Sequence, residues 1–363
     1  MKNNNILICS YPHKTFYSSK EINKIISRSI KYPLKNQKIQ NISDGGEGVS
    51  DLFKSNKFKK INVENTNMKK KAIKFKVLNQ MAIIEVSDII GGFEAKIKDG
   101  MYRTSYGIGS AIKKLYKKGI KKIIIGFGGS TVSDFGLGLA ISLGVKFYDK
   151  NNNLICNKNN NFNAYSLKNI KKINLQNFFF KKKNLECLLL SDTNIKLLGS
   201  NGQVEVFAEQ KGISGKNKKI LKTGFENFKV LMEKKFQKKI DKKYMGAGGG
   251  TLAMIYCLFN SKLLIGQEYL SNKIKLEEKI KKSDLIISGE GCFDNSSKTK
   301  GIWKIIKISK KYKKKIILIV GKTKLKINFK NVSILKMFNN YKKNISKINI
   351  EKRMIEICKK LEV

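Results

Sequence analysis

The sequence predicts an α/β protein built on parallel sheets. Short apolar runs alternate with amphipathic segments, and most of the runs end in a glycine-rich or acidic turn. Hydrophobic residues make up 41% of the 363 residues, which argues against disorder although 28% are charged. A chain of this length is long enough for about two domains, each with its own buried core.

The first unit of this pattern lies at the amino terminus. Residues 6–10 predict a short buried strand. Ser18 and Glu21 stand at the spacing of a capping box, and Ile22 and Ile26 fall on one face of the helix that would follow. Strand, loop and helix in this order are the start of an α/β unit.

Two further strands are predicted to end in loops suited to ligand chemistry. A strand near 38–43 runs into residues 44–48, where Asp44 and Glu47 alternate with glycines. A helix that stops at Gly119 precedes a strand over 121–125. The carboxyl end of a parallel strand is a usual place for a binding site, so both loops are candidates.

The rest of the chain continues the parallel-sheet pattern. Strands are predicted at 188–190, 285–287 and 316–320, the last two separated by a helix and each followed by a polar or glycine turn. An amphipathic helix is predicted at 351–363. The Asn- and Lys-rich segment 151–183 is interpreted as a surface excursion, anchored by three consecutive phenylalanines.

The net charge of +48 would by itself suggest a nucleic acid or an anionic membrane as partner. Nearly all of the positive charge is lysine, and the only arginines are Arg28, Arg103 and Arg353. Specific readers of bases and phosphates depend heavily on arginine, and these lysines are scattered. We therefore expect no specific nucleic-acid partner, although the phenylalanines at 178–180 among lysines leave an aromatic patch as an alternative.

Cysteine and histidine usage disfavours a zinc site. The six cysteines form no C-x-x-C pair, and His13 is the only histidine. No stretch approaches the roughly 18 apolar residues of a membrane-spanning helix, and the apolar run at 6–9 is too short for a signal sequence. The expected compartment is the reducing cytoplasm, with no membrane partner.

The loops at strand ends carry the residue types that phosphoryl transfer requires. Gly126, Gly128, Gly129 and Ser130 can bring backbone N–H groups and a hydroxyl close to an anion. Further acids stand near predicted strand ends, and each of them could instead cap a turn or a helix. The set comprises Asp44, Asp134, Asp192 and Glu290. Four acidic loops gathered at one sheet edge favour chemistry over capping.

Taken in order, these loops resemble the motifs of type-1 glycerate kinases, and the resemblance spans nearly the whole chain. The motifs are Asp44-Gly45-Gly46-Glu47-Gly48 with Asp51, Thr104-Ser105-Tyr106-Gly107-x-Gly109, Gly126-x-Gly128-Gly129-Ser130-x-x-x-Asp134, Asn201-Gly202 with Gln210-Lys211-Gly212, Gly246-Ala247-Gly248, and Ser288-Gly289-Glu290-Gly291 with Asp294.

The resemblance implies a Rossmann-like domain with a second α/β domain inserted. We expect the first domain over 1–60 and 275–363 and the inserted domain over 61–274, with 100–145 assignable to either. It also implies ATP-dependent, Mg2+-assisted phosphorylation of glycerate, with ATP and glycerate as the small-molecule ligands.

The resemblance also implies roles for individual residues. Catalytic roles would fall to Asp134, Asp192 and Lys14, and the metal would be held by Asp192 and Asp134. Phosphate or ATP binding would fall to Gly126, Gly128, Gly129, Ser130, Lys211 and Glu290. Substrate or loop positions would be Asp44, Glu47, Ser105 and Asp294.

The chain departs from the family pattern at several positions. Tyr11 and Pro12 stand where the family has Asp and Ser, and Cys292 replaces a basic residue. Ser133 stands for Asn, residues 295–297 replace Gly-Gln-Ser, and the loop at 246–250 is shortened. These departures predict slow turnover that the reversion of Tyr11 to Asp with Pro12 to Ser would raise at least about tenfold. A catalytically degenerate binding protein and a lysine-rich nucleic-acid binder are the alternative interpretations.

Overall fold

The computed structural model describes residues 5–13, 16–55, 58–92, 99–155, 162–191, 193–323, 325, 329–338 and 346–361. Two compact units divide the chain. The first unit comprises residues 1–44, 51–53 and 266–363, and the second comprises residues 45–50 and 54–265. The second unit is therefore inserted in the chain between the two halves of the first.

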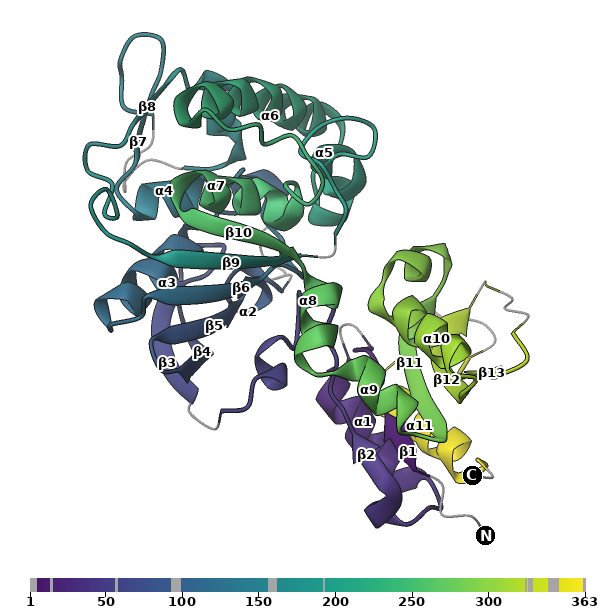
Figure 1. Cartoon of the computed structure of the whole chain (residues 1–363). Helices are drawn as coiled ribbons and strands as arrows, with labels where there is room; N and C mark the ends of the chain where they lie inside the picture. Colours follow the sequence, from purple (N-terminus) through teal and green to yellow (C-terminus); the bar gives the residue numbers. More distant parts are fainter. Residues whose placement is uncertain are drawn as a thin grey trace. The chain divides into compact units, whose positions relative to one another are not determined.

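The first unit is built on a five-stranded sheet in the order β13-β12-β11-β1-β2 (Figure 1), and every adjacent pair is parallel. Its strands are β1 (Ile6–Ile8), β2 (Gln37–Ile39), β11 (Leu285–Phe293), β12 (Lys315–Thr323) and β13 (Val332–Lys336). The inner strands β1, β11 and β12 are mostly buried, as expected of a parallel sheet covered on both faces.

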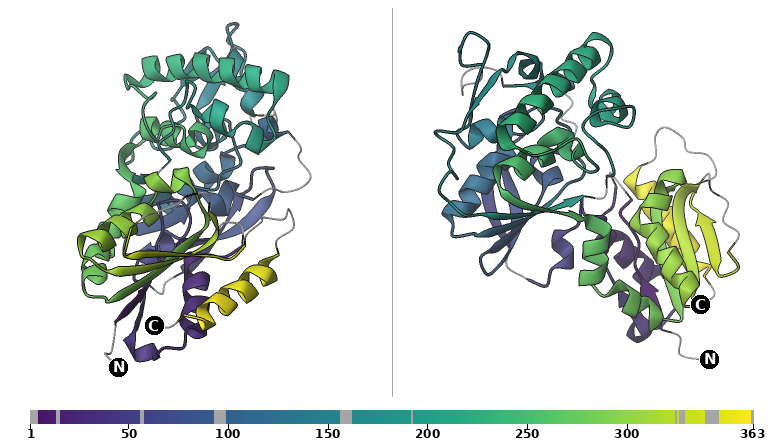
Figure 2. Two further views of the ribbon diagram at one scale, coloured as in Figure 1. Left: turned by 90° about the vertical axis from the view of Figure 1, so that its right-hand side faces the viewer. Right: turned by 45° about the horizontal axis from the view of Figure 1, so that its top comes forward.

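Helices pack on both faces of this sheet. The helices are α1 (Ser19–Ser29), α8 (Gly266–Lys273), α9 (Leu276–Lys281), α10 (Gly301–Lys311) and α11 (Lys347–Lys359). Helices α1 and α11 lie side by side (Figure 2) and share one core with Ile6, Ile8 and Ile287 of the strands. Helix α10 packs against β11, β12 and α9. This arrangement is the Rossmann-like domain that the sequence predicts.

The second unit contains a six-stranded mixed sheet in the order β10-β9-β6-β5-β4-β3 and a two-stranded sheet of β7 and β8. Strands β5, β6, β9 and β10 are parallel, whereas β3 and β4 add an antiparallel edge. The strands are β3 (Phe58–Glu64), β4 (Lys70–Leu78), β5 (Met81–Glu85), β6 (Lys122–Gly126), β7 (Lys146–Tyr148), β8 (Lys172–Asn174), β9 (Glu186–Ser191) and β10 (Asn260–Ile265).

The helices of the second unit share one large apolar core with its strands. They are α2 (Val86–Ile90), α3 (Tyr106–Lys117), α4 (Leu137–Ser142), α5 (Gln203–Phe207), α6 (Gly215–Phe236) and α7 (Thr251–Leu258). Phe225 and Phe228 of α6 contact the ring of Phe135, so the outer helix in Figure 1 is tied to the loop before α4. This core keeps the strand ends of the unit in a fixed arrangement.

Short 3₁₀ helices connect these elements within the described residues. They are η1 (Leu34–Asn36), η2 (Ser50–Leu52), η3 (Gly100–Tyr102), η4 (Ala164–Asn169), η5 (Glu209–Lys211), η6 (Ala247–Gly250) and η7 (Asn295–Thr299).

The predicted fold class is confirmed, and so are several local predictions. Ser18 caps α1 in a reciprocal capping box with Glu21, and the helix expected before Gly119 is α3. Two predictions were inaccurate: the strand near 38–43 is β2, which ends at Ile39, and the turn expected after residue 287 lies inside β11. Strand pairing with β12 continues through Glu290 and resumes at Cys292, which explains why the glycines there do not end the strand.

The observed units differ from the expected domains at their boundaries. Residues 266–273 form α8 of the first unit, although the sequence-based boundary stands at 275, and 100–145 falls in the second unit. Among the described residues, no helix is both long and apolar enough to cross a membrane.

Candidate active site

In the second unit, one sequence-predicted candidate, Gly126, is the last residue of a parallel strand. Glu85 ends β5, Gly126 ends β6 and Ser191 ends β9. These three strands are neighbours in the sheet, so the loops that follow them emerge at one edge. The expectation that the four predicted acids gather at one sheet edge is wrong, because Asp44 and Glu290 belong to the first unit and Asp134 belongs to the second, each with a sheet of its own.

Gly46 and Gly128 bring two loops of this unit into close backbone contact. A β carbon added to Gly128 would stand 2.7 Å from the α carbon of Gly46, and one added to Gly126 would stand 2.7 Å from the carbonyl oxygen of Gly46. Real β carbons do not approach other atoms so closely, so neither loop glycine can carry a side chain without a shift. Glycine is required here for loop packing, in addition to any role in approaching an anion.

Glu85, the last residue of β5, holds residues 45–50 in place through hydrogen bonds. Its carboxylate accepts hydrogen bonds from the backbone N–H groups of Gly48, at 2.8 Å, and Ser50, at 2.9 Å. Burial raises the pKa of Glu85 to about 7, against the opposing effect of the Ser50 N–H and with a further increase from the charge of Asp88. Residues 45–50 are thereby fixed between β5 and the loop after β6.

The accessible part of the loop after β6 is Gly129 and Ser130. Gly129 is exposed and takes a left-handed conformation with φ of 61°, and Ser130 is half-buried. The Oε1 atom of Glu47 lies 2.6 Å from the place a β carbon on Gly129 would occupy, and the Glu47 side chain is exposed. A carboxylate and exposed loop backbone are therefore neighbours at this edge.

Asp134 is fully buried and surrounded by donors. It accepts hydrogen bonds from the Ser105 N–H at 2.7 Å and the Ser105 hydroxyl at 2.8 Å, and from the N–H groups of Gly136 and Gly138 at 3.1 Å. Burial raises the pKa of Asp134, and these donations oppose the rise. Its oxygens serve the backbone before α4 and the start of α3, so the geometry favours a structural role for Asp134 and for Ser105. The metal and catalytic assignments of Asp134 stay sequence-based predictions.

Lys211 is buried near Asp134. Its Nζ donates to the carbonyl oxygen of Val132 at 2.6 Å and lies over the ring of Phe207, and its own carbonyl accepts from Arg103. Burial lowers the pKa of Lys211 to about 7; the charge of Asp134 opposes this effect and that of Arg103 adds to it. Lys211 therefore changes its charge near neutral pH.

In the first unit, a second group of candidates lies beyond the strand ends. Asp44 follows β2, and its Oδ1 accepts the N–H of Gly301, the first residue of α10, at 3.0 Å. Asp294 directly follows β11 and caps η7 in a capping box with Ser297. Both acids thus have capping partners, which is one of the interpretations that the sequence allows.

Glu290 lies within β11 and is 8% exposed. The Ser297 hydroxyl donates a hydrogen bond to its Oε1. Burial raises the pKa of Glu290 to about 7, the Ser297 bond and Lys300 oppose this, and the charges of Asp44 and Asp294 add to it. The negative charges of Asp44 and Asp294 therefore both disfavour the ionised form of Glu290.

Two predicted residues, Lys14 and Asp192, lie outside the described residues. Within the described part of the chain, no cluster of three or more His, Cys, Asp or Glu side chains could hold a metal ion. The structure thus brings together Glu47 with Gly129 and Ser130, Asp134 with Ser105 and Lys211, and Asp44 with Glu290 and Asp294.

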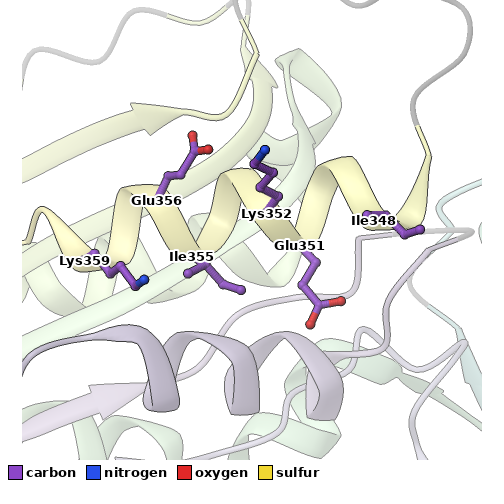
Figure 3. Close-up of a pocket in the computed structure, with 6 residues that line it drawn as sticks. All are labelled: Ile348, Glu351, Lys352, Ile355, Glu356 and Lys359. Atoms are coloured by element: carbon purple, nitrogen blue, oxygen red, sulfur yellow. The ribbon is translucent and has the colours of Figure 1, made fainter.

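Two further features, an aromatic cluster and a surface pocket, are formed by residues outside these groups. The rings of Phe178, Phe179 and Phe180 pack against one another and against Tyr116 and Phe259, as the hydrophobic-anchor interpretation expects. A surface pocket of about 370 Å³ is lined by residues of α11 alone (Figure 3), namely Ile348, Glu351, Lys352, Ile355, Glu356 and Lys359. None of these six is a candidate site residue.

The sequence interpretation missed Glu85 and the side-chain environment of Tyr11. Glu85 has the same signal as the predicted acids, an acid at a strand end, but the strand 81–85 was not predicted. Tyr11 is only 6% exposed, and its ring lies against Gly301, which is far away in the sequence. No local sequence pattern signals that contact.

The sequence profile described as the glycerate kinase family matches residues 6–357. The chain belongs to the glycerate kinase family. The predicted enzyme class, a phosphotransferase of this family, is thereby confirmed. A glycerate kinase of Neisseria meningitidis serogroup B is 27% identical over 263 residues, 70% of this chain and 68% of the relative. A glycerate 2-kinase of Escherichia coli K12 is 31% identical over 229 residues, 62% of this chain and 59% of the relative.

A solved structure shows the same fold. It is a protein of Salmonella typhimurium LT2 assigned as glycerate kinase 2, and it matches with a TM-score of 0.74 at 22% sequence identity. The match covers 98% of this glycerate kinase family chain and 96% of the Salmonella chain.

Proposed function

We propose that the chain transfers the γ-phosphoryl group of ATP to a hydroxyl group of glycerate, with Mg2+ as the metal. The observation that carries this proposal is the family match over 6–357, which includes every loop described above. Relatives named glycerate kinase or glycerate 2-kinase support glycerate as the substrate.

The donor set fits a magnesium–phosphate ligand. Mg2+ is usually bound by one or two carboxylates together with substrate phosphates and water, so a dedicated protein cage is not required. Glu47 is an exposed carboxylate beside the exposed backbone of Gly129. Glu47 would hold the ion, and Asp192 is a second candidate from the sequence. When bound, Mg2+ would neutralise charge on the phosphate oxygens.

The protein groups would bind and orient the reactants. Gly129 and Ser130 offer backbone and hydroxyl donors to phosphate oxygens, and Lys211 adds a positive charge when protonated. Asp44 would contact the hydroxyl groups of glycerate. The proton of the attacking hydroxyl would go to a carboxylate, for which Asp192 is the sequence-based candidate. Phosphoryl transfer needs little more than this positioning and charge stabilisation.

A coupled assay for ADP release, with ATP, Mg2+ and each glycerate enantiomer, tests the proposal. We expect glycerate-dependent ADP release that stops when EDTA removes the metal. Folded protein that releases no ADP with either enantiomer, yet binds ATP or glycerate in a thermal-shift titration, would instead be the catalytically degenerate binding protein. The sequence-based expectation of slow turnover is measured in the same assay as kcat.

A further inference from the structure

Tyr11 and Asp44 share the space beside Gly301 in the first unit. A β carbon placed on Gly301 would stand 1.7 Å from the Tyr11 hydroxyl oxygen and 2.6 Å from Oδ1 of Asp44. The hydroxyl oxygen of Tyr11 and the carboxylate oxygen of Asp44 therefore both lie next to the space that a side chain at position 301 would occupy. Glycine at this position makes room for the phenol.

The backbone that carries Tyr11 is held in place by neighbouring strands. The Tyr11 N–H donates to the carbonyl oxygen of Gly289 at 2.9 Å, and the Ser10 hydroxyl donates to the same oxygen at 3.1 Å. Asn23 of α1 accepts the Ser10 N–H at 2.7 Å. With 6% of its surface exposed, Tyr11 is a packed residue of this loop and has a defined place.

Asp44 is held at the first turn of α10. The N-cap residue Lys300 makes no capping hydrogen bond with its side chain, and Asp44 accepts the Gly301 N–H in its place. A carboxylate at a helix amino terminus is stabilised by the helix dipole. The Asp44 carboxylate is thus bounded by the helix on one side and by the phenol on another.

We propose that Tyr11 is a positioning residue, which fixes the Asp44 carboxylate at the start of α10 in the orientation used to bind glycerate. This inference rests on the proposed function, in which Asp44 contacts the glycerate hydroxyl groups. The family pattern has an acidic residue at this position. Tyr11 would serve the site differently, by holding the carboxylate of Asp44 in place. It acts through Asp44 and takes no part in the chemical step.

The packing changes the expectation for the sequence-based reversion. Aspartate at position 11 is too short to fill the space of the phenol, and it adds a second carboxylate near Asp44, where like charges repel. We therefore expect Tyr11→Asp with Pro12→Ser to bring no gain in turnover, instead of the tenfold gain that sequence alone predicts. A tenfold gain would overturn the inference.

The functional test compares Tyr11→Phe with Tyr269→Phe, a half-buried tyrosine of α8, as the matched control. Tyr11→Phe keeps the ring and removes the hydroxyl, so we expect the KM for glycerate to rise about fivefold to tenfold and the KM for ATP to change less than twofold. Asp44→Asn should raise the glycerate KM as well, and the double variant should show less than the product of the two effects. An unchanged glycerate KM in Tyr11→Phe would show that the ring only fills space.

A second measurement tests the packing without the activity. Gly301→Ala should lower the unfolding temperature in the wild-type background and do so less in the Tyr11→Ala background, where the phenol is gone and the Asp44 oxygen still lies close. Equal losses in both backgrounds would contradict the shared space and overturn the inference. Wild-type protein without turnover would contradict the proposed function and this inference with it, whereas normal turnover with an unchanged KM in Tyr11→Phe would contradict this inference alone.

Discussion

The backbones of Gly46 and Gly128 are in such close contact that a β carbon on Gly46 would stand 2.9 Å from the α carbon of Gly128. Two loops that are both rich in glycine therefore pack directly on each other in the second unit. The contact explains why glycine is needed at both positions before any ligand is considered.

We expect Gly128→Ala to lower the free energy of unfolding by about 2 kcal/mol or more, because the added methyl group must displace backbone. Gly199→Ala is the control: Gly199 has φ of 90° and nothing within 4 Å, so the change should cost only about 1 kcal/mol of backbone strain. Urea denaturation of both variants measures the difference. Equal costs would mean that the loops separate easily.

Asp134→Asn should destabilise the protein strongly. The carboxylate oxygens now accept hydrogen bonds from N–H and hydroxyl groups. The NH2 group of asparagine cannot accept these bonds, and the buried site offers no other acceptors for its own hydrogens. We expect a loss of about 3 kcal/mol or more in the free energy of unfolding. Asp149→Asn, in an exposed turn where water can replace lost partners, should change the stability far less. A variant of normal stability that has lost turnover would restore the sequence-based metal or base role of Asp134.

The raised pKa values of Glu85 and Glu290 predict a stability that falls with rising pH. Burial raises the pKa of both carboxyl groups to about 7 in the folded protein, from an ordinary glutamate value of 4.5. Between these values the folded state keeps protons that the unfolded state has released, so the stability contributed by these two groups is fully present below pH 4.5 and is lost as the pH rises through about 7. Each group accounts for up to about 3 kcal/mol.

Glu85→Gln and Glu290→Gln should each flatten this dependence, because glutamine does not titrate. Thermal unfolding at pH values from 5 to 8 measures the slope for each variant. Glu226→Gln, on an exposed position of α6, is the control and should leave the slope as in the wild type. If either variant keeps the pH dependence of the wild type, the carboxyl group it removes is hydrated in solution and its pKa is not raised.

Lys211 should make the affinity for phosphate-bearing ligands depend on pH. Its pKa is lowered to about 7, so the positive charge is present below pH 7 and is lost above it. We expect ADP affinity to fall between pH 6.5 and 8.5 more in the wild type than in Lys211→Met. Calorimetric titration at several pH values measures the difference. Parallel curves for the two proteins would remove Lys211 from the phosphate site.

Sequence alone determined the features that depend on near neighbours in the chain. The capping box joins Ser18 to Glu21, three positions further on, and the apolar runs of β1, β6 and β9 identify buried parallel strands by composition alone. The order of the glycine and acidic motifs was sufficient to predict the glycerate kinase family and the fold class. Strands β3, β4 and β5 were not predicted, although β4 alternates Ile73, Phe75 and Val77 with lysines and β5 carries a short apolar run, both of which are strand signals.

Only the tertiary structure decided how the candidate acids are used. Asp44 caps a helix whose first residue is 257 positions away, and Asp134 accepts hydrogen bonds from the N-cap residue of α3 and from the first turn of α4. The pKa values of Glu85, Glu290 and Lys211 follow from burial, which is created by segments that meet only in the folded chain. A sequence pattern specifies the residue type at a strand end, but desolvation and hydrogen-bond partners depend on what packs around it.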